Sequence, residues 1–116
     1  MAYDQEVRDA LEDHLPLLED VTSRAMFGGV GYMVRGKMFA AQTEGAVAAK
    51  LPEEFRTRAL ALAGVSPFRP SGRPFGEWVQ FVVLLADDVP AVVPWLEAAY
   101  EYVGPLPARA RRTRRA

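Results

Sequence analysis

The chain has 116 residues, of which 50% are hydrophobic and 25% are charged, as expected for one soluble globular domain. It has no cysteine, which excludes disulfides, thiolate metal sites and a thiol nucleophile. It also lacks an apolar run of the roughly 18 residues that a membrane span needs. We therefore expect a cytoplasmic protein with no membrane partner.

The net charge of −1 is unevenly distributed. Residues 108–116 carry five arginines and no acid, so residues 1–107 sum to −1 − 5 = −6. We interpret residues 1–107 as a single domain and residues 108–116 as a disordered tail. The acidic domain should repel nucleic acid at long range, which confines any such contact to the tail. The candidate nucleic-acid residues are Arg109, Arg111, Arg112, Arg114 and Arg115.

The first predicted helix begins at Asp4, whose side chain can cap it. His14, the only histidine, lies at helical spacing from Val7 and Leu11 and is expected in or beside the core. Pro16 interrupts this pattern, which predicts a kink or a break near His14.

Several short strands follow the first helix. Arg35-Gly36 lies between two apolar runs, which predicts a hairpin with a two-residue turn. Pairing across that turn would place Tyr32 opposite Phe39. A second turn, at residues 43–45, leads into another strand.

A second helix is expected after Pro52, a strand over residues 78–85 and a last helix within residues 88–103. The predicted order is α-β-β-β-β-α-β-α. Because turns of two or three residues make neighbouring strands antiparallel, we expect an α+β fold: an antiparallel sheet of about five strands with helices packed on one face.

The glycines of the MFGGVG segment admit two interpretations. Gly28, Gly29 and Gly31 could cradle a phosphate, but a phosphate loop leads from a strand into a helix. Here the glycines lead into a strand and a hairpin. We therefore favour a structural role, in a bulge or in close backbone packing.

The sequence offers no convincing catalytic set. The paired acids at residues 53–54 and 87–88 each open a predicted helix, where capping explains them. No serine lies in a nucleophile elbow, and one histidine with scattered carboxylates does not make a zinc site. We predict no catalytic residue, no cofactor and no metal, and we lean against an enzyme.

Two surfaces remain as candidates for binding. Lys37 and Lys50 lie on successive strands, where edge protection and ligand binding are alternatives. With Arg73 and Trp78 they could converge on a pocket for an anionic small molecule, between the Pro-rich segment and the sheet. The full candidate ligand or partner surface is Met26, Phe27, Gly28, Gly29, Lys37, Lys50, Arg73 and Trp78.

The other surface is on the last helix. Trp95 and Tyr102 widen its apolar face beyond one packing stripe. They are either buried inside the fold or form a partner or dimer surface, a role in which aromatic residues are common.

Residues 24–40, RAMFGGVGYMVRGKMFA, resemble the N-terminal domain of the TfoX/Sxy family, whose signature is a basic residue, MFGG, a strand, a glycine turn and KMFA or KMA. GRPFGEWVQF at residues 72–81 and PWLEAAYEYVGPLPAR at residues 94–109 are similar to later segments of the small stand-alone, actinobacterial-type members. The similarity extends from about Val21 to Arg109.

This resemblance implies a non-catalytic regulatory or protein-interaction domain, related to regulators of competence and transcription, with no established catalytic residues to transfer. A protein partner is expected, which could be a second copy in a homodimer. The alternatives are a sensor of an anionic small molecule and weak nucleic-acid association through the arginine tail.

Overall fold

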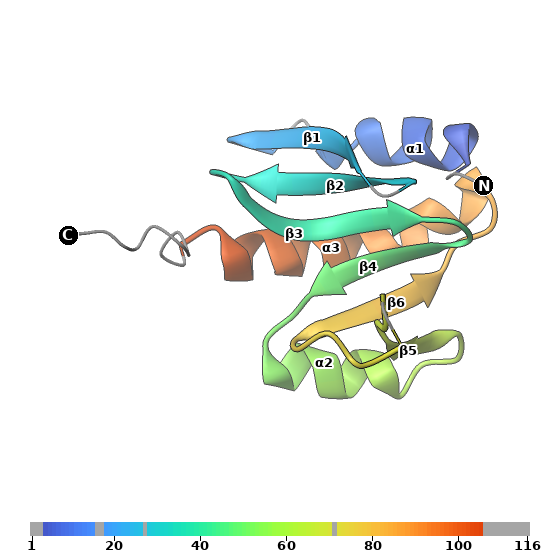
Figure 1. Cartoon of the computed structure of the whole chain (residues 1–116), viewed down its shortest axis with the longest axis vertical. Helices are drawn as coiled ribbons and strands as arrows, with labels where there is room; N and C mark the ends of the chain where they lie inside the picture. The colour runs from blue at the N-terminus through green and yellow to red at the C-terminus, as the bar shows by residue number, and fades with distance from the viewer. Residues whose placement is uncertain (1–3, 16–17, 27, 71, 106–116) are drawn as a thin grey trace.

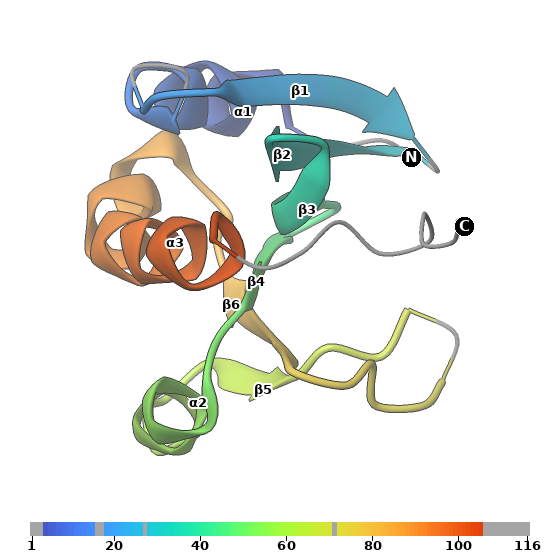
Figure 2. The same cartoon turned by 90° about the vertical axis from the view of Figure 1, so that its left-hand side faces the viewer.

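Six antiparallel strands form one sheet, and the helices cover one of its two faces (Figure 1 and Figure 2). The computed structural model describes residues 4–15, 18–26, 28–70 and 72–105. The strand order across the sheet is β1-β2-β3-β4-β6-β5. The strands are β1 (Val21–Met26), β2 (Gly29–Val34), β3 (Lys37–Thr43), β4 (Ala46–Lys50), β5 (Val65–Pro67) and β6 (Trp78–Val82).

The predicted α+β class and the one-sided packing of the helices are confirmed. The order along the described chain is α-β-β-β-β-α-β-β-α, so the structure adds a strand to the five expected. That strand is β5, three residues in the turn-rich passage before β6. It pairs with β6 from Val65 opposite Phe81 to Pro67 opposite Val79.

Helix α1 (Gln5–Glu12) begins where predicted, because the Asp4 carboxylate accepts hydrogen bonds from the amides of Glu6 and Val7 at 2.8 and 3.1 Å. It ends close to the predicted break. His14 lies beyond the helix and is exposed, so the expected core or boundary position is wrong. The helical periodicity does not extend to His14 because the helix has already ended.

Helix α2 (Glu53–Leu60) follows Pro52, and α3 (Val89–Val103) follows a short 3-10 turn, Ala86–Asp88. Pro90 lies in the first turn of α3, whereas Pro94 lies inside it. The buried stripe of α3 packs on the sheet and consists of Val89, Val92, Leu96, Ala99 and Val103.

The predicted hairpin between β2 and β3 is confirmed: Arg35 and Gly36 have φ values of 51° and 81°, as a primed turn requires. The expected pairing of Tyr32 with Phe39 is wrong, because the register shifts beyond Met33 and Tyr32 pairs with Ala40. This bulge gives β3 an extra residue. As a result, Phe39 and Ala40 are both fully buried in the core.

Candidate functional site

One row of paired residues crosses the whole sheet on the face without helices. On the four central strands its neighbours are buried, and side chains alternate between the two faces. The second, third and fourth of its six positions are the small residues Gly31, Ala41 and Ala48, so this part of the face is low. In strand order the row is Arg24, Gly31, Ala41, Ala48, Gln80 and Ser66.

The loop between β5 and β6 projects on this helix-free side (Figure 2). We call its described residues, 68–70 and 72–77, the β5–β6 loop. The Phe75 amide donates to the Phe68 carbonyl at 2.8 Å, and the Phe68 amide donates to the Trp78 carbonyl at 3.2 Å. The three rings lie 6.0–6.2 Å apart. The base of the loop is therefore held by backbone hydrogen bonds and by an aromatic cluster.

A cavity of about 640 Å³ lies between the β5–β6 loop and the sheet. This volume falls within the roughly 300–1,000 Å³ of small-molecule sites. Its lining is largely apolar, and among the described residues that line it Arg69 is the only charged one. The lining residues are Gly29, Val30, Met38, Ala41, Gln42, Thr43, Phe68, Arg69, Pro70, Phe75 and Gln80.

The glycines of the MFGG segment have structural roles, as expected. Gly28 has φ +75° in the turn before β2. A Cβ atom on Gly29 would overlap the backbone carbonyl oxygen of Gln42 on β3. Gly29 therefore permits close packing of backbone with Gln42, and both residues line the cavity. Phe27 and the side chain of Met26 lie outside the described residues.

Of the predicted ligand surface, only Gly29 is among the described residues that line this cavity. Lys37 pairs with buried Val34 and so lies on the helix side, where its Nζ donates to the Gly104 carbonyl at 2.9 Å. Arg35 donates to the same carbonyl at 3.1 Å. Both cations thus bind the carboxyl end of α3, which suits the helix dipole.

Lys50, Arg73 and Trp78 are also separate from the cavity lining. The Lys50 Nζ lies 3.9 Å from Glu77 Oε1, Trp78 is buried in the aromatic cluster, and Arg73 is exposed on the β5–β6 loop. The expected convergence of these side chains with Lys37 does not occur at this cavity. Their binding of a ligand or partner stays a prediction.

Trp95 and Tyr102 make contacts within the chain. The Trp95 ring lies 6.3 Å from Phe55 on α2 and 5.9 Å from Phe81 on β6, so it joins three elements. The Tyr102 hydroxyl donates to Glu77 Oε2 at 3.0 Å. Burial and the Glu77 carboxylate raise the pKa of Tyr102. These contacts favour a role inside the fold, and a dimer through this flank stays a prediction.

Several acidic side chains of the described residues serve in caps and ion pairs. No cluster of three or more His, Cys, Asp or Glu that could hold a metal occurs in the part of the chain that the structure describes. Asp88 caps the turn before α3: its carboxylate accepts hydrogen bonds from the amides of Leu84 and Leu85 at 3.0 and 3.1 Å. The cavity itself offers apolar surface, amide and hydroxyl groups and one guanidinium, which is chemistry for binding.

Sequence reasoning missed most of the residues that line the cavity. Gln80 had a usable signal, because it alternates with the apolar Val79 and Phe81 and must face the other side of the sheet. Phe68, Arg69 and Phe75 had none, since they meet the sheet only through the pairing of β5 with β6.

The arginine tail, 109–115, lies outside the described residues. Among the described helices, none has the length and apolarity to cross a membrane.

Comparison with known proteins gives one informative result. No curated protein and no solved structure matches the chain. The family model of the TfoX N-terminal domain matches residues 13–103, which include all six strands, α2 and α3. This range also contains the MFGG segment and the β5–β6 loop. The chain therefore belongs to the TfoX N-terminal domain family.

Proposed function

We propose that this domain is a non-catalytic regulatory module that acts by binding a partner molecule on the helix-free face of its sheet. The observation that carries the proposal is the largely apolar cavity of about 640 Å³ under the β5–β6 loop. A cytoplasmic location, expected from the sequence, is part of the same proposal.

The residues of this face support binding. An antiparallel sheet with one face in water normally alternates apolar and polar residues along each strand. Here Met33, Met38 and Ala41, at outward positions of β2 and β3, are apolar and partly exposed. Apolar surface left in contact with water lowers solubility unless another molecule covers it.

The rim of the cavity continues the apolar surface. Phe75, which lines the cavity from the β5–β6 loop, is 48% exposed. A cavity that opens to solvent beside an apolar rim suits a compact ligand whose bound form a larger protein could recognise. A protein segment that inserts a side chain is the alternative occupant of the same face.

The experiment is a fluorescence titration with N-phenyl-1-naphthylamine, a neutral probe that brightens in apolar surroundings. We expect saturable brightening with the wild-type chain. Ala41→Phe puts a phenyl ring into the cavity and should remove most of the signal. Ala25→Phe is the matched control, because Ala25 is an exposed strand residue paired with Val30 on the other face.

Thermal unfolding of both variants checks that they fold. Phe75→Ala serves as a second variant. It removes a half-exposed residue of the cavity wall, outside the core, and should weaken binding of the probe. Absence of saturable brightening in the wild type, or full brightening in Ala41→Phe, contradicts the proposal.

A further inference from the structure

The arginines of the described residues fall into two groups. The first group has partners: Arg8, Arg35 and Arg56 lie within 4 Å of Glu12, Asp20 and Glu77, and Arg58 lies over the ring of Phe55. The second group is Arg24, Arg69 and Arg73. Within residues 4–15, 18–26, 28–70 and 72–105, the structure gives their side chains no ion pair and no hydrogen bond.

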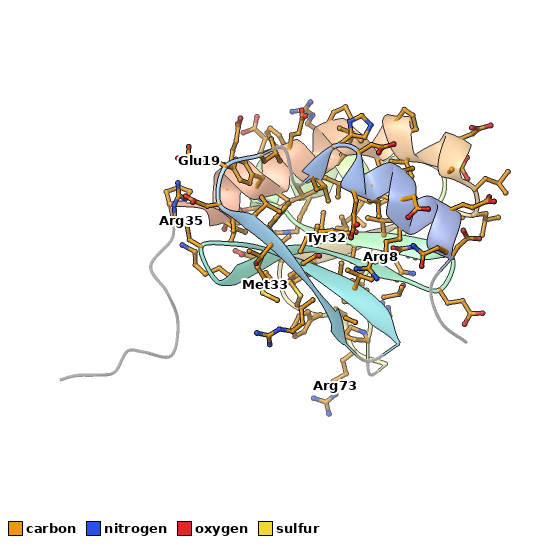
Figure 3. All side chains as sticks on the ribbon, turned by 90° about the horizontal axis from the view of Figure 1, so that it is seen from above. Arg8, Glu19, Tyr32, Met33, Arg35 and Arg73 are labelled. Carbon is orange, nitrogen blue, oxygen red and sulfur yellow. The ribbon has the colours of Figure 1, made fainter. Side chains whose placement is uncertain are left out.

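All three arginines of the second group lie on the helix-free side of the sheet. Arg24 ends the row that runs through Gly31 and Ala41. Arg69 lines the cavity, and Arg73 follows it in the same loop. Figure 3 shows Arg73 projecting from the side opposite to the helices, whereas Tyr32 lies on the helix side.

The local charge of the cavity is therefore opposite to that of the domain. Residues 1–107 sum to −6, yet the described lining of the cavity contains one guanidinium and no carboxylate. Arg69 is exposed, and a cation without a partner beside an apolar surface attracts anions. The cavity is thus suited to a molecule that is both apolar and negatively charged.

We propose that the cavity binds an organic carboxylate with a flat apolar body, and that Arg69 binds the carboxylate group. This inference rests on the proposed function and names its ligand class. The small side chain of Ala41 leaves a low floor, and the rings of Phe68 and Phe75 supply an aromatic wall. A guanidinium holds a carboxylate through two parallel hydrogen bonds, which a neutral amide cannot accept equally well.

The test compares 2-naphthoate with 2-naphthamide, its neutral counterpart with the same rings, by calorimetric titration of the full chain. We expect naphthoate to bind about ten-fold more tightly at low salt, as for a charge-assisted hydrogen-bonded pair. About 0.5 M NaCl should reduce this preference through screening. Arg69→Gln should lower naphthoate affinity to that of naphthamide and leave naphthamide unchanged. Arg73→Gln, in the same loop but outside the lining, should keep the preference.

The outcomes separate this inference from the proposed function. Binding of both compounds with equal affinity, unaffected by Arg69→Gln, overturns the anion inference and leaves the proposed function standing. Failure of both compounds to bind overturns both. Naphthoate binding that persists in Ala41→Phe means that the anion lies elsewhere, such as on the arginine tail, and also overturns the inference.

Discussion

Replacing Gly29 by alanine tests whether the MFGG segment serves the packing of the sheet. The added Cβ would overlap the Gln42 carbonyl oxygen and lie 3.4 Å from the Gln42 carbonyl carbon and 3.6 Å from Thr43 Cα. All three atoms belong to the backbone of β3, so no rotamer change relieves the overlap. Strands β2 and β3 must separate locally. Overpacking costs about 1–3 kcal/mol, and a lost strand hydrogen bond adds roughly 0.5–1.5 kcal/mol.

We therefore expect Gly29→Ala to lower the free energy of unfolding by about 2–4 kcal/mol, measured by urea denaturation. For a domain of this size that corresponds to a melting temperature lower by roughly 10–20 °C. Gly28→Ala is the matched control. Gly28 has φ +75°, but nothing lies within 4 Å of the position that an added methyl group would take. Gly28→Ala should therefore lower the free energy of unfolding only through the left-handed backbone conformation, by about 1–2 kcal/mol. If Gly29→Ala costs no more than Gly28→Ala, the packing argument is wrong.

Three further predictions follow from other contacts. Trp95→Ala removes the ring contacts with α2 and β6 and should lower the free energy of unfolding in urea by about 2–4 kcal/mol. Its mass in sedimentation should equal that of the wild type. A lower mass would instead support a dimer surface. Because the folded-state pKa of Tyr102 is raised above its ordinary 10.0, the stabilisation from its hydrogen bond to Glu77 is present below pH 10 and is lost as pH rises through the folded value. The stability gap between wild type and Tyr102→Phe, expected to be about 1 kcal/mol near neutral pH, should therefore narrow above pH 10, and a constant gap would contradict this interpretation. Removing residues 108–116 deletes five arginines and should abolish any salt-sensitive DNA binding in a gel-shift titration, whereas binding that survives excludes the tail as the contact.

Local chemistry made much of the fold predictable. The Arg35-Gly36 turn and the cap at Asp4 depend on residues close in sequence, and both formed as expected. The bulge in β3 was not predictable from the turn, because it depends on where the helices accommodate the Phe39 ring, 5.7 Å from Tyr100 on α3. Strand β5 was missed because three residues with a proline carry no alternation, and its partner lies beyond a long loop.

The position of the cavity was easier to predict than its lining. The alternative of a small-molecule sensor placed a pocket between the Pro-rich segment and the sheet; a cavity lies there, but none of the four residues assigned to that pocket is among its described lining. The lysines were assigned to it because exposed strand cations suggest anion binding. Lys37 instead binds the end of α3, and Lys50 lies beside Glu77. Both contacts join segments far apart in the chain, so no local pattern could reveal them.

The central claim is that the helix-free face of the sheet is the binding surface. Amide chemical-shift mapping of the isotope-labelled chain during titration with neutral 2-naphthamide tests this claim independently of charge. We predict that the largest shift changes occur on the amides of Gly31, Ala41, Phe75 and Gln80, and that the amides of α1 and α3 stay near their free positions. Largest changes on α1 or α3, or no changes at saturating probe, would contradict the account.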